Sequence, residues 1–537
     1  MVPVPAECFT LLPMPVSRSP VSRAFFLCPP IHPIVKVRVN RLVGSLMVSL
    51  LLIAPVPSTL AESDLPADAA PISSIDELRD CNLYATSGLR RIEARCGWFE
   101  VAENRDDADS RKIRLHIALV PAVDETAGGS PLTLLAGGPG QSAQDVYTSV
   151  APALSRVRKK HPILLVDQRG TGRSNQLSCD DQEEIEDQEW STELMREVVG
   201  ECLEALDTDT RFYTTSVAVR DLDEVRQMLG FEQLNLLGGS YGTRVALHYL
   251  RRYPQATRAV IIDGVVPADL ALGPGIAIDA QNALDMAFAR CAADDACHEA
   301  FPDPAADVRL LLEQLAANPV SLTLPDPLTG EMLDKRLDKN QFMGALRMLI
   351  YSPETVALIP LLLREAASGN PAPMLAQSLM IASNIGEMMA MGMHNAVICT
   401  EDVPFFQDPD SYEPELERTF LGTIMLDGMG AICDVWPAGI IDDEFKTPVV
   451  SDIPVLLLSG EADPVTPPAY AIQAMETLSN SQHLVLIGQG HGQIGTGCMP
   501  QLLGEFIANP NSLPLDDACI DRTRPTGFFL DFNGPSP

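Results

Sequence analysis

The sequence predicts an α/β fold in which a mostly parallel sheet is flanked by helices. The first indication is an alternation of short apolar runs with helical segments between residues 132 and 262, which resumes at residue 454. A strand–helix–strand order of this kind gives right-handed crossovers, and these place the strands parallel. The second indication is the stretch 269–449, where the alternation stops and a helical pattern replaces it. We therefore expect a sheet whose sequence is interrupted by an inserted helical cap.

The stretch around Ser240 is the third indication, and it also points to chemistry. The apolar run 234–237 leads into Gly-x-Ser-x-Gly, and residues 244–252 then carry apolar side chains at helical spacing. A serine between a strand and a helix lies on a strained turn that exposes its hydroxyl. Gly238 and Gly242 have no Cβ atoms to clash where strand and helix crowd together. This context distinguishes a nucleophile elbow from a chance match in a glycine-rich loop.

Local patterns predict the remaining strands and a helix before the elbow. Residues 113–120 alternate apolar and polar side chains, and His116 falls on the polar phase, so we expect this histidine at the surface. Residues 217–229 have apolar side chains along one helical face. The other strands are expected at 96–101, 132–135, 163–166, 259–262, 454–460 and 483–487.

Two loops after predicted strands are unusual in composition. Residues 136–142 read Ala-Gly-Gly-Pro-Gly-Gln-Ser, and glycines there let backbone N–H groups approach a ligand closely. The alternative is an ordinary Gly-Pro turn. Residues 167–174, Asp-Gln-Arg-Gly-Thr-Gly-Arg-Ser, would by themselves be no more than a charged turn.

The first 61 residues resemble an export signal. Three basic residues between 36 and 41 precede the apolar run 42–53, and small residues at 58–61 fit cleavage after Ala61. The run is short for a membrane span, and no cysteine follows it directly, so neither stable membrane insertion nor a lipid anchor is expected. The segment before Val35 either belongs to this signal or lies upstream of the true start. We expect an exported protein, periplasmic or extracellular.

Export determines how the cysteines are interpreted. Twelve cysteines are present, and two of them, Cys8 and Cys28, lie in the leader. In an oxidising compartment the other ten should form disulfides, and pairing nearest neighbours closes the shortest loops. A loop of about 15 residues contributes roughly 3 kcal/mol. Zinc is the alternative, but no Cys-x2-Cys spacing supports it. The expected pairs are Cys81–Cys96, Cys179–Cys202, Cys291–Cys297, Cys399–Cys433 and Cys498–Cys519.

Composition limits the classes of partner. The chain has 537 residues, 46% of them hydrophobic, which is enough for a large core. Its formal charge of −34 argues against nucleic acid and anionic membranes as partners. We expect a first core segment at 62–268, the cap at 269–449 and a second core segment at 450–537.

An activated serine needs a base, and the base needs a carboxylate to orient it. His491 follows a sheet strand in a glycine-rich loop that leaves its ring free, and Asp463 likewise follows a strand end. The order Ser240, Asp463, His491 is the chain order of α/β-hydrolases. The other histidines lie in the leader, at the predicted surface, beside strands, in the elbow helix or in the cap: His32, His116, His161, His248, His298, His394 and His483.

These motifs together resemble the prolyl aminopeptidase family of α/β-hydrolases, and the secreted tripeptidyl-aminopeptidase-like branch fits best. The resemblance rests on the two loops, the elbow, Asp463 and Gly490-His491-Gly492, and it covers most of the mature chain. The long cap, the cysteines and the C-terminal segment at about 433–537 suit the secreted branch. Ala136 departs from the family, which usually has His there, so strict proline specificity is not implied.

The resemblance implies acyl transfer on peptide substrates, with no metal or organic cofactor. Ser240 would attack the carbonyl, His491 would move the proton, and Asp463 would orient His491. Backbone N–H groups of Tyr241 and of the glycine loop, most simply Gly138, would hold the oxyanion.

The resemblance also suggests how a free amino terminus would be held. Relatives have a Cys-x-Glu segment beside the active site, which here is Cys399-Thr400-Glu401. Glu401, with Asp402 as the second choice, would then pair with the substrate ammonium. The alternative is that both carboxylates begin a solvated loop before Pro404.

Two other functions compete with an aminopeptidase. An exported esterase would have the same fold but no anionic pocket in the cap for an ammonium group. A non-catalytic binding protein would also share the fold, because fold does not fix function. The intact Ser240, Asp463 and His491 argue against this second alternative.

Overall fold

The computed structural model describes residues 66, 68–85, 90–179, 191–327, 329–386, 389–406 and 411–535. They belong to one compact unit, Glu62–Pro537. The leader predicted at 1–61 lies outside the described residues.

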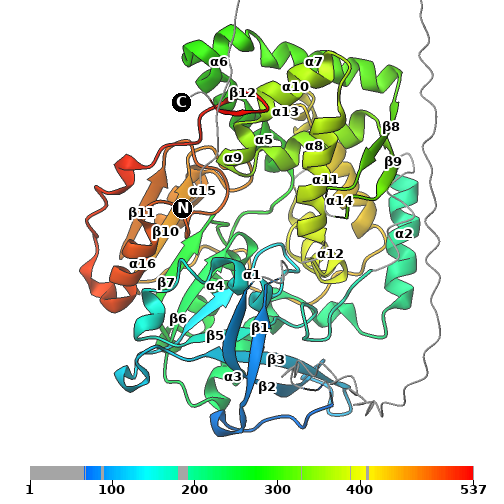
Figure 1. Ribbon diagram of the computed structural model, residues 1–537. Helices are drawn as coiled ribbons and strands as arrows, with labels where there is room; N and C mark the ends of the chain where they lie inside the picture. Colours follow the sequence, from blue (N-terminus) through cyan, green and yellow to red (C-terminus); the bar gives the residue numbers. More distant parts are fainter. Residues whose placement is uncertain are drawn as a thin grey trace, which may run out of the picture. The chain divides into compact units, whose positions relative to one another are not determined.

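The predicted sheet is present, with strands in the order β1-β2-β3-β5-β4-β6-β7-β10-β11 (Figure 1). The strands from β5 to β11 in this order are parallel, whereas β1, β2 and β3 pair antiparallel and β3 joins β5 antiparallel. This confirms the α/β fold with a mostly parallel sheet. The strands are β1 (Arg79–Tyr84), β2 (Arg91–Ala102), β3 (Lys112–Val120), β4 (Leu132–Leu135), β5 (Ile163–Val166), β6 (Leu234–Gly239), β7 (Thr257–Asp263), β10 (Val455–Gly460) and β11 (Ser481–Leu486).

Helices cover both faces of the sheet, which explains why the central strands β4, β5, β6, β7 and β10 are mainly apolar. Leu236 of β6 packs into a cluster with α3 (Thr215–Met228), α4 (Tyr241–Arg252) and α15 (Pro468–Met475). The next residue, Leu237, packs into the opposite cluster with α1 (Ala143–Val150) and α16 (Met499–Ala508). Successive side chains therefore bury on opposite faces, as a strand requires.

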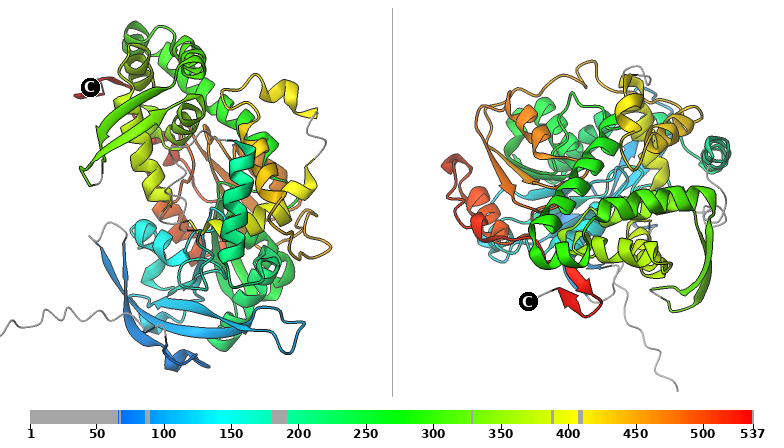
Figure 2. Two further views of the ribbon diagram at one scale, coloured as in Figure 1. Left: turned by 90° about the vertical axis from the view of Figure 1, so that its right-hand side faces the viewer. Right: turned by 90° about the horizontal axis from the view of Figure 1, so that it is seen from above.

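The residues between β7 and β10, 264–454, form what we call the insert, which has an apolar core of its own. Its helices lie together in Figures 1 and 2, coloured green to yellow. They are α5 (Pro274–Ala293), α6 (Asp295–Ala300), α7 (Pro304–Ala317), α8 (Lys339–Leu349), α9 (Pro353–Val356), α10 (Ile359–Ala367), α11 (Ala372–Gly386), α12 (Met391–Glu401), α13 (Glu413–Leu416) and α14 (Ile424–Cys433). Within the ranges given above, no helix is long and apolar enough to cross a membrane.

The insert also contains a hairpin that the sequence did not predict. Strands β8 (Val320–Pro325) and β9 (Met332–Leu337) pair antiparallel (Figure 2). In β8 only Leu324 is buried, so the period-two pattern that identifies a half-buried strand is missing. A short α2 (Thr192–Ala205) precedes the elbow, and β12 (Phe529–Asp531) and β13 (Gly534–Pro535) form a small C-terminal hairpin.

The expectation that His116 lies at the surface is wrong, because the residue is buried. Its Nδ1 lies 2.7 Å from Nε2 of Gln144 on α1, and its ring lies 4.7 Å from the ring of Trp98. The polar phase of β3 is therefore covered by a helix and by a neighbouring strand, which no local pattern reveals.

Five disulfides join the ten cysteines of the described chain, in the pairs expected from nearest neighbours. Cys81–Cys96 joins β1 to β2, and Cys399–Cys433 joins α12 to α14. Cys291–Cys297 joins α5 to α6, which places all three of these bridges between successive or packed elements.

Candidate active site

The predicted catalytic residues meet at the carboxyl edge of the sheet. Strands β6, β7, β10 and β11 are parallel neighbours, so the loops that follow them lie at one edge. Ser240 follows β6, Asp463 follows β10 and His491 follows β11. The Nδ1 atom of His491 lies 2.8 Å from Oδ2 of Asp463, which brings together two of the three residues.

Ser240 has the strained backbone expected of a nucleophile elbow. Its φ of 53° and ψ of −124° are rare for any residue but glycine, and its N–H donates to the Asp263 carbonyl at 2.8 Å. A Cβ on Gly238 would lie 2.3 Å from the Gly242 carbonyl oxygen, and a Cβ on Gly242 would lie 2.0 Å from that of Leu135. Any side chain at either glycine would push strand and helix apart.

His491 lies beside the end of β7, the strand next to the one that carries Ser240. A Cβ on Gly264, the residue after Asp263, would lie 2.9 Å from Cε1 of His491. On its other side, the His491 N–H donates to the Tyr351 carbonyl at 2.8 Å, and the two rings meet edge to face at 5.7 Å. The imidazole is thus held between β7 and the insert.

The pair His491–Asp463 is electrostatically coupled. Burial lowers the pKa of His491, but the charge and hydrogen bond of Asp463 outweigh it, so the pKa is raised. Burial would raise the pKa of Asp463, yet His491 and the N–H groups of Thr466 and Val465 lower it. The Thr466 hydroxyl also donates to Oδ2 of Asp463 at 2.9 Å. Asp463 is therefore an ionised carboxylate that favours a protonated His491.

The glycine loop, residues 136–142, contacts the nucleophile. A Cβ on Gly137 would lie 3.1 Å from the Ser240 Cβ, so Gly137 is the loop residue that touches it. No hydrogen bond among the described residues uses the backbone N–H of Gly138 or of Tyr241, the two donors expected for the oxyanion. A cavity of about 20 Å³ adjoins this loop and is lined by Gly137, Gln168 and Tyr241 among others.

Glu401 and Asp402 lie in a buried ion pair with Arg244, which contradicts the solvated-loop alternative, and the ammonium contact expected of them stays a prediction. Asp402 Oδ1 accepts from Arg244 Nη2 at 2.6 Å, and Glu401 Oε2 lies 3.4 Å from Arg244 Nη1. Both carboxylates are at most 2% exposed, so they do not begin a solvated loop. The Leu272 N–H and Lys446 supply further partners for Asp402. The carboxylates of Glu401 and Asp402 therefore join the end of α12 to Arg244 of the elbow helix α4.

Glu401 is also connected to the residue after the nucleophile. It accepts from the Thr215 N–H at 2.7 Å and from the Thr215 hydroxyl at 2.9 Å. The same hydroxyl lies 2.7 Å from the Tyr241 OH, which accepts from Gln168 Nε2 at 3.0 Å. This network fixes the Tyr241 side chain, and with it the backbone that follows Ser240.

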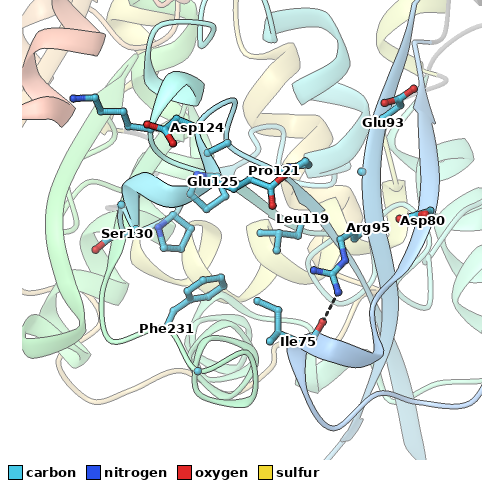
Figure 3. A pocket seen from close by; sticks show the side chains of 18 of the residues that line it. Ile75, Asp80, Glu93, Arg95, Leu119, Pro121, Asp124, Glu125, Ser130 and Phe231 are labelled. Carbon is cyan, nitrogen blue, oxygen red and sulfur yellow. Dashed lines mark hydrogen bonds between the residues drawn. The ribbon is translucent and has the colours of Figure 1, made fainter.

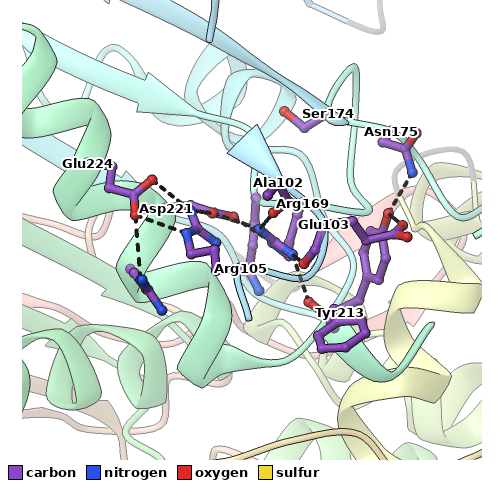
Figure 4. Close-up of polar contacts among 12 residues, drawn as sticks. Ala102, Glu103, Arg105, Arg169, Ser174, Asn175, Tyr213, Asp221 and Glu224 are labelled. Atoms are coloured by element: carbon purple, nitrogen blue, oxygen red, sulfur yellow. Dashed lines mark hydrogen bonds and ion pairs between the residues drawn. The ribbon is translucent and has the colours of Figure 1, made fainter. Parts of the chain in front are cut away.

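The charged loop, residues 167–174, is anchored by a buried arginine (Figure 4). Arg169 donates through Nε and Nη2 to the two oxygens of Asp221 on α3, at 2.6 and 2.8 Å. Arg105 pairs with the same Asp221 and with Glu224. A fully buried Arg169 between Asp221 and backbone carbonyls makes this loop part of the core, and Gln168 is positioned beside it.

A larger cavity lies away from this edge of the sheet. It measures about 970 Å³, and Ser130, Pro121 and Phe231 are among its lining residues (Figure 3). Pro131, Pro162 and Gln233, which directly precede β4, β5 and β6, also line it. Ser240 lies at the opposite ends of these strands, so this cavity is not part of the catalytic edge. The described residues contain no group of three or more His, Cys, Asp or Glu side chains placed to hold a metal ion.

Sequence reasoning missed several residues that surround the site. Asp263 could have been found, because it ends an apolar strand next to the elbow strand. Asp279, Arg347 and Tyr351 have no such signal, because they come from the helical insert. Thr466 lies in a turn after Asp463, and only the structure shows its hydrogen bond to that residue.

Comparison with known proteins agrees with this fold. Residues 130–497 match the family described as alpha/beta hydrolase fold. The chain is 25% identical over 462 residues to serine protease Hip1 of Mycobacterium tuberculosis, covering 79% of this chain and 87% of that protein. It is 32% identical over 146 residues to tripeptidyl aminopeptidase of Streptomyces coelicolor, covering 24% of this chain and 27% of that protein.

A solved structure, the esterase RhEst1 from Rhodococcus sp., has a TM-score of 0.35 and 16% identity, covering 80% of this chain and 99% of that one. The family match spans more than half of the chain, from the loop before β4 to the loop after His491. The chain therefore belongs to the α/β-hydrolase family, and serine peptidases are among the relatives to which it is similar.

Proposed function

We propose that the chain is an exported serine hydrolase that removes residues or short peptides from the free amino terminus of peptides. The observation that supports it most is the 2.8 Å contact of His491 with Asp463 at the sheet edge that carries the strained Ser240. Ser240 Oγ attacks the scissile carbonyl, and His491 takes its proton and later gives it to the leaving amine. Asp463 orients His491 and stabilises its protonated form.

The tetrahedral intermediate carries a negative oxygen, which the backbone N–H groups of Gly138 and Tyr241 stabilise in this proposal. Neither donor has an acceptor among the described residues, so both are available to bind an oxyanion. The network of Glu401, Thr215 and Gln168 supports the Tyr241 side chain from behind. Glu401 is thus a positioning residue in this mechanism.

The substrate ammonium needs a carboxylate that has no cation of its own, and Asp279 on α5 fits this requirement. Its Oδ2 accepts from the Tyr470 OH at 2.6 Å, and no ion pair joins it to a described residue. Burial raises the pKa of Asp279 to about 6, and the charge of Asp463 adds to the increase. We assign the ammonium contact to Asp279 in place of Glu401 and Asp402.

Export and a capping role for the insert complete the proposal. Five disulfides in the described chain suit an oxidising compartment, to which a leader at residues 1–61 would direct the protein. The insert supplies Tyr351 against His491 and Asp279 near Asp463, which supports its role as the cap over the site.

The proposal is tested with purified mature protein, a fluorophosphonate and two matched arylamides. The fluorophosphonate should label Ser240 in the native protein and leave Ser240→Ala unlabelled. A tripeptidyl arylamide with a free amino terminus should be cleaved, and its N-acetylated form should be cleaved about ten- to hundred-fold less well. Equal cleavage of both forms would favour an esterase or general amidase, and absence of labelling would favour a binding protein.

The Asp279 assignment has its own test. Asp279→Asn should lower kcat/KM for the free-amino arylamide by about ten- to hundred-fold, because a charge-assisted contact contributes roughly 1.5–3 kcal/mol. Hydrolysis of a neutral acetate ester should be almost unchanged. Asp285→Asn, an exposed carboxylate on the same helix, is the matched control. If both substrates are affected equally, Asp279 is structural.

A further inference from the structure

Arg347 on α8 is a half-buried arginine that pairs with no carboxylate of the described residues. Its Nε is buried with no hydrogen-bond acceptor, and no hydrogen bond or ion pair joins it to a described residue. Arg169 and Arg244 differ, since each is paired with a buried aspartate. Arg290 on α5 also has no acid partner among the described residues, but it lies over the Phe528 ring and not beside His491. In a chain with a formal charge of −34, a half-buried guanidinium with no anion requires an explanation.

Arg347 lies one aromatic ring away from the proposed base. The centre of its guanidinium is 5.6 Å from the centroid of the Tyr351 ring, and that ring is 5.7 Å from the ring of His491. The Tyr351 carbonyl also accepts the His491 N–H at 2.8 Å. The positive charge therefore approaches the catalytic edge from the insert, on the side of His491 that Tyr351 covers.

This charge acts against the proposed chemistry in the free protein. Burial and Arg347 both lower the pKa of His491, while Asp463 and Asp263 raise it. His491 must become positively charged when it takes the proton of Ser240, and a nearby uncompensated cation disfavours that form. An anion bound to Arg347 would remove this penalty when substrate is present.

We propose that Arg347 binds a carboxylate of the substrate, so the preferred substrates are short peptides whose carboxylate reaches Arg347 while their scissile carbonyl lies at Ser240. The inference rests on the proposed triad and does not depend on which group binds the ammonium. A guanidinium presents several N–H donors in a planar fork that matches a carboxylate. The carboxylate comes either from the C-terminus of the peptide or from an acidic side chain.

The test compares three peptides of one sequence: a tripeptide free acid, its C-terminal amide, and an amide in which one residue is replaced by Glu. The wild-type protein should show a kcat/KM about ten- to hundred-fold higher for the free acid than for the plain amide. Recovery with the Glu amide would identify a side-chain carboxylate, and its absence would identify the C-terminus. Equal kcat/KM for all three peptides would overturn the inference.

Arg347→Met should abolish this preference, whereas Arg347→Lys, which keeps the charge but not the planar fork, should retain part of it. Arg309→Met, an exposed arginine on α7 of the same insert, should leave the preference unchanged. A preference that persists in Arg347→Met excludes Arg347 as the anchor. If Arg347→Met does not fold, a reduced preference in a folded Arg347→Lys supports the inference, and an unchanged preference contradicts it.

A pH profile gives a second readout that a purely structural role would not affect. With a neutral acetate ester, which has no carboxylate, Arg347→Met should raise the midpoint of the acid limb of kcat/KM, because a cation that lowers the pKa of His491 is gone. An unchanged midpoint would contradict the inference. Ester hydrolysis that survives in Ser240→Ala would instead contradict the proposed triad, so the two failures are distinguishable.

Discussion

The charged groups at the carboxyl edge of the sheet and those of the insert differ in their partners. At the sheet edge, Asp463 bonds to His491, and Asp263 accepts the backbone N–H groups of Gln493 and Ile494. In the insert, Asp279 and Arg347 have no opposite charge among the described residues. The groups proposed to move protons are thus preorganised by hydrogen bonds in the free protein, whereas the two groups proposed to bind ions have no counterion among the described residues.

This difference separates chemistry from recognition within one site. A preorganised pair costs little reorganisation during reaction, so the sheet edge should act on any ester or amide that reaches Ser240. Asp279 and Arg347 of the insert should affect kcat/KM only for substrates that carry an ammonium group or a carboxylate, respectively. Variants at the two regions should therefore respond differently to a neutral ester and a charged peptide.

The largest expected effect comes from the sheet edge. Ser240→Ala and His491→Ala should each lower kcat by about 10⁴-fold or more on every substrate, and the double variant should be little worse, because the residues act as a unit. Steady-state rates on the acetate ester and the free-amino arylamide measure this. Turnover of Ser240→Ala at the wild-type level, with contaminating hydrolases excluded, would end the proposed mechanism.

The next effect concerns stability, and it separates a buried ion pair of the insert from an exposed one. Asp402→Asn removes one of the two negative charges that pair with the buried Arg244. It should therefore destabilise the protein by about 3–5 kcal/mol. Asp434→Asn removes a partner of Arg196 in an exposed pair and should cost about 1 kcal/mol or less. Urea unfolding of both variants gives the comparison, and similar midpoints would show that Arg244 finds other partners.

Glu401→Gln should have a smaller effect that is equal on both substrates. The substitution weakens the hydrogen bonds to Thr215 that support Tyr241, so kcat/KM should fall about tenfold for the acetate ester and for the free-amino arylamide alike. A fall confined to the free-amino arylamide would restore Glu401 as the ammonium anchor that the sequence suggested.

Much of the sheet edge could be predicted from the sequence, because its elements leave local patterns. Strands buried on both faces are continuous apolar runs, and the loops that follow them are where functional residues of such sheets lie. Strand β1 was missed because its six residues bury only Cys81 and Leu83, which makes no apolar run. His116 was misplaced because Gln144 and Trp98 cover it from other elements.

The insert was harder to predict for a physical reason. The partner of Glu401 and Asp402 is Arg244, more than 150 residues earlier in the chain, and helical periodicity does not specify which helices meet. The same holds for Arg347, which is one polar residue among others on α8 until Tyr351 and His491 are placed beside it. Recognition in this molecule depends on tertiary placement, so local sequence patterns do not identify it.

The smallest expected effect comes from Asp263, whose negative charge acts on His491 in the direction opposite to the positive charge of Arg347. Burial raises the pKa of Asp263 to about 6, and its charge in turn raises the pKa of His491. Its Oδ2 accepts both backbone N–H groups, and its Oδ1 has no partner, so Asp263→Asn can keep these hydrogen bonds with its carbonyl oxygen.

Removing this charge should lower the pKa of His491, so the acid limb of kcat/KM on the acetate ester should move to lower pH by less than about one unit. Arg347→Met should move the same limb to higher pH, because it removes the charge of opposite sign. Opposite shifts of two variants with one neutral substrate would show that both groups act on His491 through their charge. Shifts in the same direction would mean that the variants act through packing, and the contrast between the sheet edge and the insert would then not be electrostatic.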